Sequence, residues 1–251
     1  MTREPAVNRK WALGRGASET WRRLREGWAA LPSGNAARWG MTVVVGFFLA
    51  CLLTWGMTSM GRRLEPGYLR EWDERALRRI EAGLMSFPDA ILAESPGNLS
   101  YLIPLTAVAA VVAARARRPM LAITFLAGYV MARPLIFLGW SLWDRSRPKL
   151  IAGGVAAPGF HSYPSGHVIL AIVVYGLIAY LWCAASRSIL ERVVVWLVFM
   201  IWIAMIGWAR LRLGTHWPSD VLAGAIIGLM WMGVMIVALR RGERVVRGAG
   251  S

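Results

Sequence analysis

From residue 41 onward the chain alternates between long apolar runs and short polar connections. Six runs are each close to the ~20 residues with which a helix crosses the hydrocarbon core of a bilayer. They are Met41–Met57, Leu99–Ala114, Met120–Trp143, Val168–Ala185, Val193–Ala209 and Val221–Leu239. Because these runs are apolar on every side of a helix, they are less typical of amphipathic helices packed in a globular protein. The pattern predicts an all-α, polytopic membrane protein with a bundle of six transmembrane helices.

The composition supports this prediction. The chain of 251 residues is 57% hydrophobic and yet has a formal charge of +15, a combination that suits a membrane protein with basic connections. If the N-terminus is cytoplasmic and the runs alternate in direction, most Lys and Arg fall in cytoplasmic segments, as the positive-inside rule requires. We therefore expect basic cytoplasmic tails at 1–40 and 240–251, a membrane domain at 41–239, and an external segment at 61–98.

The basic tail at 1–40 contains a pattern of its own. Trp21, Leu24, Trp28 and Leu31 recur at helical spacing among arginines. Such a pattern is typical of an amphipathic helix that lies on an anionic membrane surface. A partly disordered basic tail is the alternative, and the sequence leaves both open.

The histidines of the chain are few and unusually placed. There are three, His161, His167 and His216, and all fall at the predicted outer ends of the apolar runs. Histidine is costly in lipid and is suited to proton and phosphoryl chemistry near neutral pH. An interfacial histidine that only forms structural hydrogen bonds is the alternative for each one taken singly.

Two predicted helices begin with a proline at this same face. Pro164 and Pro218 stand where the fourth and sixth helices should start, and proline is favoured at the first helical position. Helix N-termini bind anions through free N–H groups, and Gly166 lets a ligand approach the backbone closely. Arg147 and Arg210 belong to the same face. Singly, each would be read as an anchor for lipid headgroups, whereas together with the histidines they favour a phosphate pocket.

These residues resemble the motifs of the type-2 phosphatidic acid phosphatase superfamily, whose fold is shared by the vanadium haloperoxidases. The family pattern is Lys-x6-Arg-Pro, then Pro-Ser-Gly-His, then Ser-Arg-x5-His-x3-Asp. The second motif is intact at Pro164–His167, and the third lacks only its first residue, which here is Ala209. The first motif keeps Arg147-Pro148 but has Trp140 in the place of the lysine.

The resemblance implies roles for individual residues. His216 would be the nucleophile that forms a phosphohistidine, and Asp220 would accept the proton of its Nδ1. His167 would be the general acid that protonates the leaving group. The groups that would hold the phosphoryl oxygens are Arg147, Arg210, Ser165 and Gly166. We expect no metal and no other cofactor, because carboxylate clusters that would hold Mg²⁺ are absent from this face.

Trp140 cannot supply the positive charge of the family lysine. Arg145 is the replacement that we favour, and we therefore count it among the phosphate-binding residues. Lys149, Arg212 and Arg133 are the alternatives, although Arg133 lies deep in the third predicted helix.

The function expected from these features is hydrolysis of a lipid phosphate or diphosphate at the external face of a bacterial inner membrane. Candidate substrates are undecaprenyl diphosphate, phosphatidylglycerol phosphate, phosphatidic acid and lipid A phosphates. A lipid phosphotransferase that uses the same phosphohistidine is one alternative, and a transporter without catalysis is another. We expect contact with membrane lipids and none with nucleic acid. The sequence predicts no oligomeric state.

Overall fold

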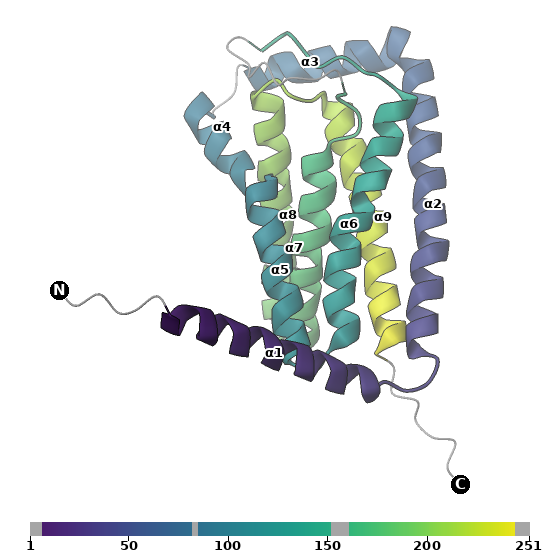
Figure 1. The fold of residues 1–251 in the computed structure, drawn as a ribbon. Helices are drawn as coiled ribbons and strands as arrows, with labels where there is room; N and C mark the ends of the chain where they lie inside the picture. Colours follow the sequence, from purple (N-terminus) through teal and green to yellow (C-terminus); the bar gives the residue numbers. More distant parts are fainter. Residues whose placement is uncertain (1–6, 82–84, 152–160, 244–251) are drawn as a thin grey trace, which may run out of the picture.

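The structure is a computed structural model that describes residues 7–81, 85–151 and 161–243. Within these residues the chain is all-helical, and six helices are long and apolar enough to cross a membrane. They are α2 (Asn35–Leu64), α5 (Leu99–Arg115), α6 (Pro119–Leu142), α7 (Gly166–Ala185), α8 (Ile189–Arg212) and α9 (Pro218–Gly242). They stand side by side as one bundle (Figure 1). The predicted all-α fold with six membrane-spanning helices is confirmed.

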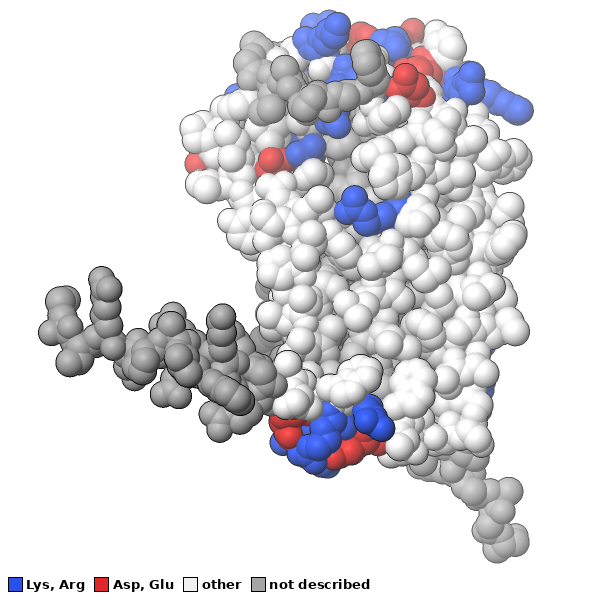
Figure 2. Space-filling model, in the orientation of Figure 1, with Lys and Arg blue, Asp and Glu red and all other residues white. Residues whose placement is uncertain are grey.

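Charged side chains gather at the two ends of the bundle. Figure 2 shows Lys, Arg, Asp and Glu concentrated there, with a mostly white belt between the ends. The belt includes large apolar side chains that face outward, among them Phe48, Val130 and Ile201, which are 69%, 58% and 67% exposed. Exposed apolar surface of this extent is unfavourable in water and favourable against lipid. The chain is therefore a multi-pass membrane protein.

The bundle packs around α7. This helix contacts α6, α8 and α9, and α2 covers α9 and α6 on the other side. Most of α7 is buried, including Ile169, Val173 and Leu177. The largest buried side chain nearby is Trp231 of α9, whose Nε1 donates to the carbonyl of Gly128 in α6 at 2.9 Å. That bond satisfies the one polar atom of the indole and fixes the separation of α6 and α9.

At one end of the bundle, α1 (Val7–Ala29) lies across the ends of the upright helices (Figure 1). Glu26 of α1 forms an ion pair with Arg117 at 2.9 Å, at the connection between α5 and α6. Trp21 and Trp28 are 61% and 49% exposed. The predicted location of this helix on a membrane surface remains a prediction. Residues 1–6 of the N-terminal tail and residues 244–251 of the C-terminal tail lie outside the described part of the chain.

At the opposite end, α3 (Arg70–Glu81) crosses over the bundle and α4 (Phe87–Glu94) descends beside α8 (Figure 1). A π-helical turn, Glu65–Leu69, joins α2 to α3, and the chain bends at Gly67. A 3₁₀ turn, Ser95–Gly97, leads from α4 into α5. The described residues of the segment predicted outside the membrane, 61–98, thus begin with the last turn of α2 and then form a helical cover over one end of the bundle.

Candidate active site

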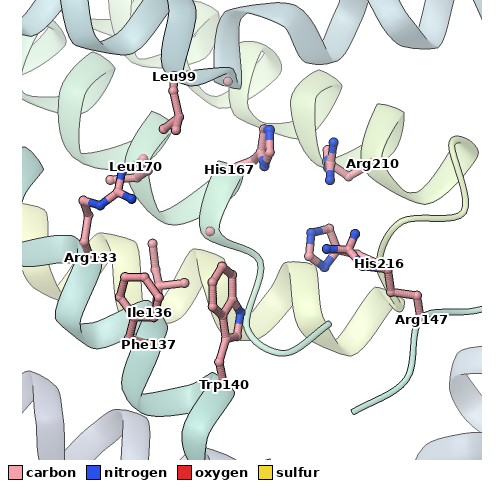
Figure 3. A pocket seen from close by; sticks show the side chains of 12 residues that line it. Leu99, Arg133, Ile136, Phe137, Trp140, Arg147, His167, Leu170, Arg210 and His216 are labelled. Carbon is pink, nitrogen blue, oxygen red and sulfur yellow. The ribbon is translucent and has the colours of Figure 1, made fainter. Parts of the chain in front are cut away.

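Three connections meet under this cover and bring the predicted site residues together. They are the chain that follows α6, the residues that lead into α7, and the residues between α8 and α9. A cavity of about 190 Å³ lies at their junction. Figure 3 shows the side chains around it. The cavity is lined by Gly97, Leu99, Arg133, Ile136, Phe137, Trp140, Arg147, Gly166, His167, Leu170, Arg210 and His216.

His216 is held in one orientation and one tautomer. Its side chain is 3% exposed, and its Nδ1 lies 2.8 Å from the carbonyl oxygen of Ser162. A carbonyl oxygen only accepts, so Nδ1 carries the hydrogen and Nε2 keeps a free lone pair. Burial lowers the pKa of His216, and the positive charge of Arg210 acts in the same direction. The ring is therefore neutral at pH 7, with Nε2 available as a nucleophile.

Asp220 contacts His216 less directly than we expected. Its Oδ2 lies 3.7 Å from His216 Nδ1, beyond hydrogen-bond range, because both of its oxygens are already engaged. Oδ2 accepts from the Ser162 hydroxyl and, at 2.7 Å, from the backbone N–H of Trp217, while Oδ1 accepts from Arg145 at 2.6 Å. The direct partner of Nδ1 is thus the Ser162 carbonyl, and Asp220 positions His216 through Ser162 and through the first turn of α9.

Arg145 does not line the cavity, contrary to our expectation that it replaces the family lysine. Its side chain is 1% exposed and donates at 2.7 Å to Asp73 of α3, as well as to Asp220. Its Nε lies 3.3 Å from Glu65, and its guanidinium packs on the rings of Trp143 and Trp217, 4.7 and 5.3 Å from their centroids. Each of its three nitrogens has a carboxylate partner, so no donor is directed towards a substrate.

The same carboxylates raise the pKa of Arg145. Burial by itself would lower that pKa, and the negative charges of Asp220 and Asp73 more than offset the burial. Asp73 also accepts from the backbone N–H and the hydroxyl of Ser219, at 2.8 and 2.7 Å. The cover helix α3 is in this way bonded to the N-terminus of α9. Asp73 lies in a highly charged amphipathic stretch, and nothing in the sequence distinguishes it from the other carboxylates there.

Arg147 and Arg210 both line the cavity, as predicted. Arg147 donates at 2.9 Å to the carbonyl of Thr215 and has no carboxylate partner among the described residues. Burial lowers the pKa of Arg147, and the nearby charge of Arg210 lowers it further. Arg210 forms an ion pair with Glu94 of α4, a partner that the sequence did not reveal. Among the described residues, the two guanidinium groups have only one carboxylate partner between them, which is Glu94. This end of the cavity is therefore electropositive.

His167 enters the cavity from the first turn of α7. Its Nε2 lies 2.8 Å from the side-chain oxygen of Asn98, the residue immediately before α5. Asn98 stands at the N-cap of a predicted span, and a signal for it was therefore present in the sequence. Helix α7 begins at Gly166 with Ser165 as its N-cap, so Pro164 precedes the first helical position that we expected it to occupy.

Close packing of two glycines keeps the loop before α7 in place. A Cβ at Gly224 of α9 would lie 2.8 Å from the Ser165 carbonyl oxygen. A Cβ at Gly139 of α6 would lie 2.3 Å from Cδ of Pro164. Both distances are shorter than real Cβ contacts, and any side chain at either position would push the loop away from the cavity.

Trp140 lies at the edge of the cavity where the family pattern has lysine. Its ring stacks on His161, with centroids 5.6 Å apart and planes at 15°. His161 is otherwise an exposed loop residue that lies 3.1 Å from Asp144 and does not line the cavity. In Figure 3 the indole nitrogen of Trp140 is turned towards His216 and Arg147. Trp140 therefore directs a hydrogen-bond donor, although not a charge, into the site.

Several donors around the cavity have no acceptor within the described residues. They are Nε1 of Trp140, Nε of Arg147 and Nε of Arg210, each buried. The hydroxyl of Ser165, next to the free N–H groups of α7, is also buried and without a partner. Buried donors are nearly always hydrogen-bonded in folded proteins. A group of unmatched donors beside two arginines is therefore a site for an anion with several oxygens.

The fold and the site define a membrane protein in which a buried, neutral histidine lies beside two arginines and a group of donors without acceptors among the described residues. A family model described as the PAP2 superfamily matches residues 118–243, about half of the chain, and the chain belongs to this family. A crystal structure of a transmembrane PAP2-type phosphatidylglycerolphosphate phosphatase from Bacillus subtilis has the same fold. It aligns with a TM-score of 0.62 and 20% identity over 78% of this chain and 94% of that chain.

A curated relative is similar over a shorter region. An undecaprenyl-diphosphatase from Sulfolobus acidocaldarius is 30% identical over 82 residues, which are 33% of this chain and 35% of the relative. The match therefore spans about a third of the relative's length. Together the comparisons place the chain in the PAP2 superfamily and show that it has the fold of a transmembrane member of that family.

The different surroundings of Arg145 and Arg147 lead to opposite predictions for two matched variants. Arg145→Ala leaves the buried carboxylates of Asp73 and Asp220 unpaired, and we expect it to lower the free energy of unfolding by about 3–5 kcal/mol. Arg147→Ala removes a side chain bonded only to carbonyls, and we expect loss of activity with little loss of stability. Thermal unfolding of both purified variants in detergent measures the difference. A normally stable but inactive Arg145→Ala protein would restore Arg145 as a phosphate ligand.

Proposed function

We propose that this protein hydrolyses the phosphate ester or diphosphate of a membrane lipid through a phosphohistidine on His216. The observation that carries the proposal is the neutral His216 ring, whose free Nε2 faces a cavity lined by unmatched donors. Nε2 would attack the phosphorus, and the bond from phosphorus to the lipid oxygen would break. His167 would give a proton to the leaving oxygen, and water would then release phosphate from His216.

The donors around the cavity fit the charge that develops during this reaction. Phosphoryl transfer depends mostly on positioning and on stabilisation of the equatorial oxygens. Arg147 and Arg210 supply positive charge, and the Ser165 hydroxyl and the first N–H groups of α7 supply neutral donors. We infer that the Nε1–H of Trp140 is a further donor to the reacting phosphate, in the place of the family lysine. The reaction as written needs no metal ion.

The covalent step can be tested by replacing the nucleophile. We expect His216→Ala to abolish phosphate release from lipid phosphates in detergent, because the variant lacks the Nε2 that forms the covalent intermediate. With a ³²P-labelled lipid, the denatured wild-type protein should retain label and the variant should not. Equal thermal midpoints would show that the variant is folded.

The same assay separates the remaining alternatives. Near-normal release by folded His216→Ala protein would refute the mechanism, and loss of wild-type activity in EDTA that Mg²⁺ restores would refute metal independence. Transfer of label to a second lipid instead of water would show a phosphotransferase.

The role of Trp140 can be tested with nearly isosteric variants. Trp140→Phe keeps the ring and removes the N–H, and a hydrogen bond to a charged group is worth about 1.5–3 kcal/mol. We therefore expect kcat/KM to fall about 10- to 100-fold, and Trp140→Lys to be more active than Trp140→Phe. Trp208→Phe, on the exposed face of α8, is the matched control and should behave as the wild type. Equal activity of Trp140→Phe and wild type would exclude this donor.

We further propose that the site faces the exterior of a bacterial inner membrane and that both termini are cytoplasmic. The proposal rests on the distribution of Lys and Arg along the sequence. In a background with Cys51→Ala and Cys183→Ala, Ser146→Cys at the site end should react with an impermeant thiol reagent in intact cells. Ala29→Cys, exposed on α1 at the other end, should react only after permeabilisation. The reverse pattern would invert the orientation.

A further inference from the structure

An arginine within the membrane-spanning part of α6 has no role in the site described so far. Arg133 is the only charged residue in the sequence of α6 and lies nine residues before the end of the helix at Leu142. At 1.5 Å per residue it is about 13 Å from that end. A charged side chain at such a depth is costly and is a functional residue by default.

No partner in the described chain accounts for Arg133. Among the residues that the structure describes, it forms no hydrogen bond, ion pair or cation–π contact. Arg133 is partly buried, whereas Arg145 and Arg210 are buried at the end of the bundle and each have a carboxylate partner. An unpaired guanidinium requires an anion from elsewhere, because the cost of removing it from water is otherwise not offset.

The position of Arg133 links it to the substrate. It lines the same cavity as His216 and Arg147, and Figure 3 shows it at the other end of that cavity, beyond Trp140. Its guanidinium is turned towards Leu170 of α7, and Trp140 lies between Arg133 and His216 in this view (Figure 3). Arg133 therefore does not belong to the group that holds the reacting phosphate. Arg133 supplies a second positive charge to the cavity, at a distance from the charges of Arg147 and Arg210.

The size and lining of the cavity indicate which part of a lipid reaches Arg133. About 190 Å³ is below the ~300 Å³ of pockets that enclose drug-sized ligands, so the cavity holds a headgroup and not a chain. Phe137, one turn after Arg133, lines the cavity and is 53% exposed on the belt. A lipid with its terminal phosphate at His216 would thus pass Arg133 before its chain enters the membrane.

We propose that Arg133 binds the second, uncleaved phosphate of a lipid that carries two phosphates, and so selects such lipids over monophosphates. This inference rests on the proposed function and adds the substrate class. Two kinds of lipid carry two phosphates in one headgroup. One is a lipid diphosphate, and the other is a lipid whose two phosphates are separated by a glycerol. In a diphosphate, attack by His216 on the terminal phosphorus breaks the bond to the bridging oxygen. The lipid monophosphate that leaves carries the developing negative charge, next to Arg133.

The test compares Arg133→Gln with the wild type on two matched pairs of lipids in detergent. One pair is farnesyl diphosphate and farnesyl phosphate. The other is phosphatidylglycerol phosphate and phosphatidic acid with the same acyl chains. We expect the ratio of kcat/KM for the two-phosphate lipid to that for the one-phosphate lipid to fall at least tenfold in Arg133→Gln. Arg133→Lys, which keeps the charge, should recover part of the ratio.

The two pairs distinguish the two chemistries. If the natural partner is a diphosphate, the first ratio falls and kcat falls with it, since Arg133 stabilises the leaving group. If the phosphates are separated by a glycerol, the second ratio falls and KM carries the change. Arg63→Gln, exposed near the end of α2, is the matched control and should leave both ratios at the wild-type values.

An unchanged ratio for both pairs in a folded variant would overturn the proposal, as would an equal loss on all four lipids. If Arg133→Gln does not fold, Arg133→Met replaces it, because an apolar side chain suits a helix in lipid, and the same ratios decide. Wild-type protein that releases no phosphate from any of the four lipids would instead refute the proposed function. Failure of the two proposals is thereby distinguishable.

Discussion

The ion pair between Arg145 and Asp220 joins the segments of the chain that build the site. Arg145 belongs to the connection after α6 and Asp220 to the first turn of α9, and Asp73 brings the cover helix α3 into the same cluster. Two tryptophan rings enclose the guanidinium, whose planar group of donors serves carboxylates on three sides. Such a buried cluster tolerates no missing member, because each carboxylate would be left without a counter-charge.

The consequences of this cluster reach His216 through short steps. Asp220 accepts from the Ser162 hydroxyl, and the Ser162 carbonyl then fixes the hydrogen on Nδ1 of His216. The ring of His216 is thus oriented by a backbone carbonyl, which in turn is positioned by the buried carboxylate. Arg145 pairs with Asp220 and does not line the cavity, whereas the guanidinium groups of Arg147 and Arg210 do.

The cavity combines features that suit a substrate bound partly in lipid. Its end at His216 has arginines, a helix N-terminus and donors without protein acceptors, whereas the walls near Ile136, Phe137 and Leu170 are apolar. A charged headgroup is favoured at the first part and a lipid chain near the second. Because Phe137 lines the cavity and is also exposed on the apolar belt, the proposed lipid substrate would remain in the bilayer while its phosphate enters the site. Arg133 lies where the two environments meet.

The sequence by itself determined the fold class and most of the charged and histidine side chains that line the cavity. Apolar runs of bilayer length define the helices, because the hydrocarbon core leaves a helix few alternatives. The spacing of Arg210, His216 and Asp220, and the Pro-Ser-Gly-His motif, identify a site because these groups are local in the chain. Only the tertiary structure decided how distant residues pair. Asp73, Glu94 and Asn98 come from the cover and its connections, and no periodicity marks which of many polar residues there face inward. For the same reason Arg145, two residues before Arg147 in the sequence, was assigned to the phosphate, although its side chain pairs with the buried carboxylates of Asp73 and Asp220.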